Sequence, residues 1–338
     1  MVKTPLLILS LLSLLIISPI SEAHTFKIAT TAPDGTAWMK KIREGAKLIK
    51  EKTQGRVKFK FYTGGVMGSD KSVLKKMRIG QLQGGAIPGG GLAEIYPDIQ
   101  IYSLPFIFKT FDEVDYVRKT MDDMLSKGLL AKGIRALGIS EGGFAYFMSR
   151  EPIRKVEDLS GLKNWLPEGD RITQTMYETV GIAPVPLSLP DVYTGLQTGL
   201  IDTIGVNPTG AIAFQWHTKI KYVTDIPLVY LLGTFIMDEK AFDKIKPEDQ
   251  KIVSETMANV FKMLDVINRE DNIKAHAALK QQGIEYIRLT AAEEKRWRKV
   301  ADKTRLSMKE KGLYTAKMYN VLTSLLQKYR KIKLTNAH

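Results

Sequence analysis

The residues that could do chemistry are few and lie far apart along the chain. The sequence contains no cysteine, which excludes disulfides, thiolate metal sites and cysteine nucleophiles. The four histidines, His24, His217, His276 and His338, show no pair at the spacing of metal ligands. The sequence also lacks a Walker phosphate loop. We therefore predict no catalytic residue, no cofactor and no metal.

The segment from Trp165 to Arg171 is the densest group of candidate binding residues. It combines an aromatic ring, a Pro-Glu-Gly turn and the carboxylates of Glu168 and Asp170. One interpretation is a solvated loop with Trp165 in the core. The other is the edge of a cleft, where Trp165 stacks on a ligand. A secreted enzyme using Glu141, Glu168 or Asp170 as acid and base is the main alternative from another class of protein.

The glycine-rich stretch 84–91 does not match the dinucleotide-binding fingerprint G-x-G-x-x-G with its acidic partner. Its glycines indicate either a close approach of the backbone at a strand end or backbone amides that line a cleft. Both interpretations stay open, because a strand-end loop in an α/β lobe is also where ligands bind.

The first 23 residues have the pattern of a secretory signal. Lys3 precedes an apolar run from Leu6 to Ile17, and Ser21-Glu22-Ala23 forms a small-x-small end. We expect cleavage after Ala23 and export to the periplasm. The net charge of +14 is spread over the chain, and export argues against a nucleic-acid partner.

Strands that alternate with helices position these residues. The pattern predicts strands near 26–30, 56–62, 134–140, 144–149 and 230–237, and helices near 37–52, 70–79, 111–126, 209–220 and 247–282. Such alternation predicts an α/β fold. Two lobes would exchange strands, with residues 24–143 plus about 235–270 in lobe I and 144–234 plus about 271–332 in lobe II.

Six stretches of the mature chain form an ordered pattern. Their order and spacing, behind a signal peptide, resemble the dicarboxylate-type (DctP-type) solute-binding proteins of tripartite ATP-independent periplasmic (TRAP) transporters. The stretches are Lys27-Ile-Ala-Thr-Thr-Ala-Pro33, Gly64-Gly-Val-Met-Gly68, Ile79-Gly-Gln-Leu-Gln83, Tyr102-Ser-Leu-Pro-Phe106, Val156-Glu-Asp-Leu-Ser-Gly-Leu-Lys163 and Asp191-Val-Tyr-Thr-Gly-Leu-Gln-Thr-Gly-Leu-Ile-Asp202.

The resemblance implies a two-lobed periplasmic-binding-protein fold, type II-like, with mixed sheets, hinge strands and a long helix spanning both lobes. It also implies capture of a small organic solute by cleft closure, and delivery to the small and large subunits of a membrane permease. The binding protein itself would be a monomer and no enzyme. The binding subunit of an ATP-driven (ABC) importer is a further alternative, which the long helix disfavours.

The chain departs from the resemblance at the ligand. In the family, the strand after Gly-Leu-Lys carries an arginine that grips the ligand carboxylate, and Trp165 stands at that position. A second arginine, expected near Ala145 or Tyr146, is also missing. Either Arg171 or Lys163 substitutes, with an organic acid as the expected solute, or the ligand is not a simple carboxylate.

The predicted ligand-binding residues therefore come from both lobes and from the hinge between them. They are Thr31, Trp38, Gly89, Glu141, Tyr146, Trp165, Glu168, Arg171 and Asn207, the last as the asparagine before proline that the resemblance implies.

Overall fold

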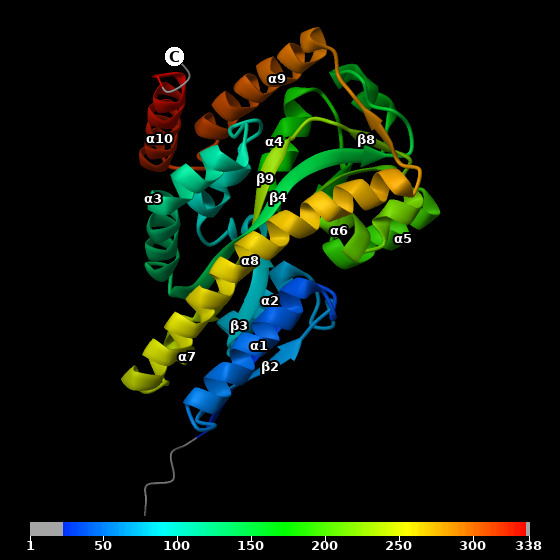
Figure 1. Ribbon diagram of the computed structural model, residues 1–338. Coiled ribbons are helices and arrows are strands. Elements are labelled where there is room, and N and C mark those ends of the chain that lie inside the picture. Colours follow the sequence, from blue (N-terminus) through cyan, green and yellow to red (C-terminus); the bar gives the residue numbers. More distant parts are fainter. Residues whose placement is uncertain (1–22, 336–338) are drawn as a thin grey trace, which may run out of the picture.

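The computed structural model describes residues 23–335 and arranges them as two α/β lobes that share one mixed sheet (Figure 1). The predicted signal peptide lies outside the described residues, except for Ala23. The sheet order is β10-β8-β4-β9-β3-β1-β2, with β7 also paired to β4, and β5 and β6 form a separate parallel pair. The strands are β1 (His24–Thr30), β2 (Val57–Tyr62), β3 (Gly84–Pro88), β4 (Ile134–Ser149), β5 (Trp165–Pro167), β6 (Val185–Leu187), β7 (Thr203–Val206), β8 (Tyr222–Thr224), β9 (Val229–Asp238) and β10 (Glu285–Ile287).

Helices cover both faces of this sheet. We call the part with β1–β3 and α1–α3 the first lobe, and the part with β5–β8 and α4–α6 the second lobe. Among the described residues, no helix is both long and apolar enough to cross a membrane. The helices are α1 (Ala37–Lys52), α2 (Asp70–Arg78), α3 (Phe111–Leu130), α4 (Arg171–Thr179), α5 (Val192–Thr198), α6 (Pro208–Ala213), α7 (Glu239–Phe242), α8 (Pro247–Gln281), α9 (Ala291–Glu310) and α10 (Ala316–Thr335).

Strand alternation explains the two layers of the first lobe. Ile28 of β1 packs with α1 and α8, whereas its neighbour Ala29 packs on the opposite face with α2 and α3. Phe235 and Ile236 of β9 divide between the two layers in the same way. Because successive strand residues point to opposite faces, a strand buried on both sides is apolar at every position.

Helix α8 runs along both lobes, as predicted (Figure 1). Pro247 begins it, where the missing N–H costs nothing. Its buried residues Val253, Met257 and Leu264 recur at spacings of a helical turn, so one face contacts the sheet throughout. It packs against α1 in the first lobe and α6 in the second. The helix is therefore a rigid element common to both lobes.

The pattern break at residues 141–143 was predicted to separate two strands, and this prediction was wrong. Strand β4 continues from Ile134 to Ser149 and pairs antiparallel with β9 along most of its length. The register shifts between Glu141 and Gly143, where Gly143 has a positive φ of 86°. Glycine adopts this conformation without strain. The local irregularity is therefore a bulge within one strand that crosses between the lobes.

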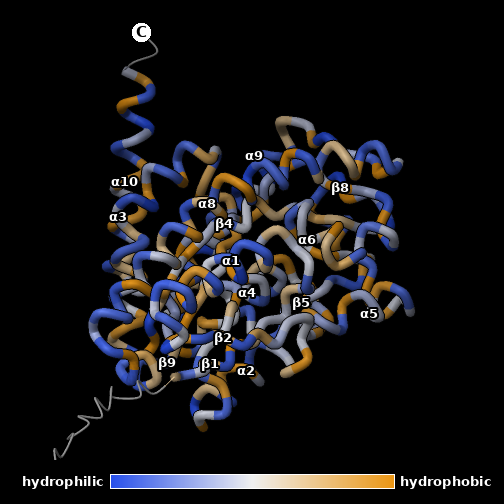
Figure 2. Tube along the Cα trace, turned by 60° about the horizontal axis from the view of Figure 1, so that its bottom comes forward, coloured by the Kyte–Doolittle hydropathy of each residue, from blue (hydrophilic) through white to orange (hydrophobic). Residues whose placement is uncertain are grey.

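The predicted lobe boundaries near residues 143 and 235 fall on β4 and β9, and the division itself stays a prediction. One assignment differs from the packing observed. Helix α10 was placed in lobe II, but it packs against α3 of the first lobe, whereas α9 packs against α4 of the second. Figure 2 shows hydrophilic and hydrophobic residues alternating along α10, and its buried face includes Leu322 and Leu326. Helix α9 therefore packs on the second lobe, and helix α10 packs on the first.

Candidate functional site

A cavity of about 350 Å³ lies between the two lobes. One wall is formed by the ends of β1 and β3 and the first turns of α1 and α2, and the opposite wall by β5, α4, β7 and α6. The strands β4 and β9 line the part between these walls. The volume lies within the range of roughly 300–1,000 Å³ that is typical of small-molecule sites.

Of the nine predicted residues, five line this cavity: Thr31, Trp38, Trp165, Glu168 and Asn207. The first two belong to the first lobe and the other three to the second. The structure therefore brings residues from distant parts of the sequence to one place. Each of these side chains is held differently, and the differences decide what it can offer a ligand.

Trp38 lies in the first turn of α1, next to β4, the strand that crosses between the lobes. Thr36 caps this helix by accepting a hydrogen bond from the Met39 N–H at 3.2 Å. The Trp38 indole N–H donates to the Ser140 hydroxyl of β4 at 3.3 Å. Trp38 therefore lines the cavity, while its polar end connects α1 to β4.

Trp165 is both a core residue and a cavity residue. It is 3% exposed and meets Trp216 edge to face, with 5.3 Å between ring centroids. Its indole N–H donates to the Leu187 carbonyl of β6 at 3.0 Å. Because that donor is used, Trp165 offers a ligand only an aromatic surface. Trp165 is therefore a core residue that also borders the cavity, and its stacking on a ligand stays a prediction.

Asn207 connects α6 to β4, the strand that crosses between the lobes. Its Oδ1 accepts from the Gly210 N–H at 3.1 Å and caps α6, while its Nδ2 donates to the Gly142 carbonyl. Both ends of the amide already have partners within the protein. Asn207 is therefore placed to hold the geometry of the cavity wall.

Glu168 and its neighbours form the rim on the side of the second lobe. Glu168 is exposed, whereas Asp170 caps α4 by accepting from the Thr173 N–H at 3.0 Å and the Thr173 hydroxyl at 2.6 Å. Burial raises the pKa of Asp170, and the hydrogen bonds from Thr173 oppose this rise. Arg171 begins α4 on its exposed side and is not among the residues that line the cavity. Its predicted part in ligand binding has no support from this placement.

Three other predicted residues, Tyr146, Gly89 and Glu141, also lie outside the cavity. Tyr146 alternates on β4 with Ala145 and Phe147, which do line it, and so faces His276 of α8 instead. Gly89 is covered by Leu232, since a Cβ added there would lie 2.9 Å from the Leu232 Cδ1. The adjacent Gly90 and Gly91 reach the cavity.

The glycine-rich stretch combines both interpretations made from its sequence. At Gly84, within β3, a Cβ would lie 2.3 Å from the Ile236 carbonyl oxygen of the neighbouring strand. That position requires glycine for close packing of the sheet. At Gly90 and Gly91, after the strand, the backbone lines the cavity.

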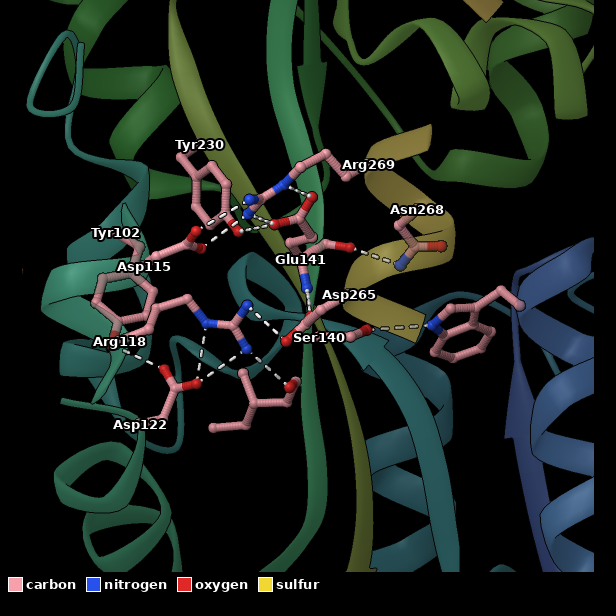
Figure 3. A network of polar contacts seen from close by, with 12 residues as sticks. Tyr102, Asp115, Arg118, Asp122, Ser140, Glu141, Tyr230, Asp265, Asn268 and Arg269 are labelled. Atoms are coloured by element: carbon pink, nitrogen blue, oxygen red, sulfur yellow. Dashed lines mark hydrogen bonds and ion pairs between the residues drawn. The ribbon is translucent and has the colours of Figure 1, made fainter. Parts of the chain in front are cut away.

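Glu141 belongs to a polar network on the opposite side of β4 (Figure 3). We call the group Asp115, Arg118, Asp122, Glu141, Asp265 and Arg269 the hinge network. Arg269 of α8 donates to Glu141 and to Asp115 of α3, while Arg118 pairs with Asp265 at 3.0 Å and Asp122 at 2.9 Å. Burial raises the pKa of Glu141, and Arg269 opposes this rise. Its carboxylate is therefore already paired and lies outside the cavity, so the predicted contact of Glu141 with the ligand has no support from this placement.

The same network holds the backbone of the bulge. Asp265 accepts from the Glu141 N–H at 2.7 Å, Asn268 donates to the Glu141 carbonyl at 2.7 Å, and Asn272 donates to the Gly142 carbonyl at 3.0 Å. Helix α8 thus satisfies the backbone groups that the bulge removes from the β-ladder. The network ties α3, β4 and α8 into one unit.

Two cavity residues that the sequence did not suggest are Asp70 and Gln100. Asp70 is the first residue of α2, where an acidic side chain is expected for helix stability alone. Burial raises its pKa to about 7; the Thr31 hydroxyl lowers it and Glu168 raises it further. Gln100 lies in the 3-10 segment Pro97–Ser103, which has no recognisable pattern. No sequence signal distinguishes either residue from a structural one.

The comparisons with known proteins agree with this architecture. Residues 28–311 match the family described as "Bacterial extracellular solute-binding protein, family 7", or DctP. This chain belongs to that family. Its members are solute-binding proteins of transporters rather than enzymes, so the secreted acid–base enzyme is set aside. The recognition made from six sequence stretches is confirmed.

Individual relatives have a low sequence identity to this chain but match most of its length. The C4-dicarboxylate-binding periplasmic protein DctP of Rhodobacter capsulatus is 26% identical over 288 residues, covering 83% of this chain and 84% of the relative. The sialic acid-binding periplasmic protein SiaP of Vibrio cholerae is 24% identical over 259 residues, covering 75% and 79%. Among solved structures, a sugar acid binding protein of Advenella mimigardefordensis with galactonate has a TM-score of 0.84 at 19% identity, covering 91% of this chain and 99% of that one. The family fold predicted from sequence is confirmed.

Proposed function

We propose that this protein is the extracytoplasmic solute-binding subunit of a TRAP transporter, exported to the periplasm after cleavage at Ala23. It captures a small organic solute between its lobes and delivers the solute to the small and large subunits of a membrane permease. The observation that carries the proposal is the cavity whose two walls come from different lobes. The DctP and SiaP relatives are named as periplasmic binding proteins, which supports the location.

Closure of the two lobes is the proposed mechanism. Solute contacts that form with both walls at once favour the closed state over the open one. The strands β4 and β9 are the proposed hinge, because they are the segments that line the cavity between the walls. The proposed contact residues are Thr31, Trp38, Trp165, Glu168 and Asn207, joined by Asp70.

The class of solute is the second part of the proposal. The relatives' names mention a C4-dicarboxylate, sialic acid and galactonate, so an organic acid is the first expectation for this chain as well. Trp165, at the position where the resemblance leads one to expect an arginine, supports a pocket that is more aromatic. Among the described residues that line the cavity there is no arginine.

Native mass spectrometry of the protein purified from periplasm tests the proposal. We expect one small organic molecule per protein, released unchanged on denaturation. Small-angle scattering with and without that molecule should then show a more compact protein when it is bound. Turnover of the molecule by the pure protein, or the absence of any bound molecule across growth conditions that include the permease's substrates, would contradict the proposal.

A further inference from the structure

Two buried oxygen atoms in the cavity have no hydrogen-bond partner in the protein. They are Oδ1 of Asp70 and Oε1 of Gln100, and both residues line the cavity. Gln100 is 3% exposed, so its amide is held inside rather than solvated. Buried acceptors are normally satisfied, because removing them from water without a donor destabilises the fold. These two acceptors therefore need donors from outside the chain.

The approach to Asp70 is kept open by glycine. A Cβ built at Gly91 would lie 3.1 Å from the Asp70 Oδ2 and 2.7 Å from the Ile87 Cγ2. Any larger residue at this position would crowd the carboxyl group. The glycine thus leaves room beside the Oδ2 atom of Asp70, although the sequence context of Asp70 is that of an ordinary helix start.

The charges around the cavity are predominantly negative. Three carboxyl groups line it, namely Asp70, Glu168 and Asp170. Within the described residues that line the cavity, the one cationic side chain is Lys71, which is exposed and lies 3.9 Å from Glu94 outside the lining. A carboxylate ligand would bring only acceptors to the ionised form of Asp70. An ammonium or amidinium group would bring both donors and the missing positive charge.

The aromatic surfaces of the cavity suit a cation as well. Trp38, Trp165, Phe214 and Trp216 all line it, and the indole N–H groups of Trp38 and Trp165 are used within the protein. Their ring faces attract a positive charge through the ring quadrupole. Aromatic side chains and a carboxylate with one oxygen lacking a partner together suit an organic cation.

We propose that the solute carries an ammonium or amidinium group that binds the Asp70 carboxylate, with Gln100 accepting a second hydrogen bond. The inference rests on the proposed function, because it assigns a chemical class to the solute of that same cavity. It differs from the expectation of a simple organic acid that the relatives' names suggest.

The proposal makes affinity depend on pH in one direction. The ionised form of Asp70 binds the cation, and in the free protein the pKa of Asp70 is about 7. The charged groups around it are Lys71 on the same helix and Glu168 and Asp170 from the facing loop. Affinity should therefore rise about tenfold per pH unit below pH 7 and level off above it. A carboxylate solute that shares a proton with Asp70 would show the opposite slope.

Matched probe sets test the class of solute. We would measure thermal shifts, and then affinities by calorimetry, with tyramine, tyrosol and 4-hydroxyphenylacetate, and with D-galactosamine, D-galactose and D-galacturonate. Within each set the skeleton stays the same while the head group is cationic, neutral or anionic. We expect the amine of at least one set to bind more tightly than its acid by about tenfold or more, with affinity rising toward pH 7.

Variants connect the result to Asp70. Asp70→Asn should weaken amine binding about tenfold or more and abolish its pH dependence, and Gln100→Leu should weaken it several-fold. Asp123→Asn, which removes an exposed carboxylate on α3, is the charge control and should change nothing. Circular dichroism of each variant verifies that it has folded.

The outcomes separate the two proposals. If an acid binds best, if no amine binds, or if the molecule released from periplasmic protein is an acid without a cationic group, the inference about Asp70 is wrong while the proposed function stands. If neither the probes nor the periplasmic preparation yields a bound molecule, the proposed function fails together with the inference.

Discussion

The two sides of strand β4 carry opposite kinds of polar group. On the side of α3 and α8, the carboxylates of the hinge network are paired with arginines, and Glu141 is held by Arg269 and Tyr230 (Figure 3). On the cavity side, Asp70 and Gln100 keep acceptor atoms without partners. The strand itself contributes to both, through Glu141 and its neighbour Gly142.

This difference separates polar groups that are satisfied within the protein from polar groups that are not. Burial alone does not distinguish them, because Glu141 and Gln100 are both almost fully buried. Pairing within the chain differs between these two residues, although buried atoms without a partner also occur away from the cavity, as at Asn164 and Thr256. A paired group contributes to the free energy of unfolding, whereas an unpaired group lowers it and is tolerated where a ligand supplies the partner.

The largest effect is expected from breaking the hinge network. Arg269→Met would leave the Glu141 carboxylate buried without its cation, and removing one partner of a buried pair costs about 3–5 kcal/mol of unfolding free energy. Urea denaturation measures this loss. Arg296→Met on α9 is the matched control, because Arg296 is half exposed and pairs with Glu157 and Glu293 at the surface, where about 0–1 kcal/mol is expected. Equal losses in both variants would show that the network is not special.

A pH-dependent effect is expected on the cavity side. The pKa of Asp70 is raised from 3.8 to about 7 in the folded protein, so between these values the folded state holds a proton that the unfolded state lacks. The contribution of Asp70 to stability is therefore favourable at low pH, falls as pH rises through that window and is constant above pH 7. Asp70→Asn should make the melting temperature fall less between pH 4 and pH 7 than in the wild type. Identical profiles for the two proteins, with Asp123→Asn as a further control, would mean that Asp70 is not buried in this way.

The smallest effect concerns Asn207, which connects the cavity wall to the bulge. Asn207→Ala removes the cap of α6 and one donor to the Gly142 carbonyl, although Asn272 still donates to that oxygen. Loss of a cap costs about 1 kcal/mol. Thr290→Ala removes the comparable cap of α9, far from the hinge. Both variants should lose similar stability, and only Asn207→Ala should also weaken binding of the solute in calorimetry.

Particular elements show how far the sequence alone could be interpreted. The periodicity of helix α8 and the alternation of β2 were readable because each depends on local residues and on one buried face. The continuity of β4 was not, because the glycines at its bulge look like a break until the partner strand β9 is seen to continue across them. Local signals predict elements, whereas pairing is a property of two distant segments.

The site was predictable in part. Thr31, Trp38, Trp165, Glu168 and Asn207, which were predicted through the resemblance and the aromatic and polar character of their segments, line the cavity. Tyr146 was assigned to the cavity as an aromatic residue near the expected second arginine, and Glu141 as a hydrogen-bond acceptor, but neither lines it. Strand alternation and the bulge decide which neighbour faces the cavity, and neither could be placed before the register with β9 was known.

The sequence by itself determined the membership of the family, many of the helices and strands, and the absence of cysteine chemistry, since each depends on residue types and their spacing. The tertiary structure decided which polar groups are paired. Asp70 resembles any acidic residue in the first turn of a helix, and Glu141 resembles any acid beside a glycine turn. Only when every possible partner is in place does one carboxylate prove to be satisfied and the other to be left open, because hydrogen bonding and desolvation depend on neighbours that are distant in sequence.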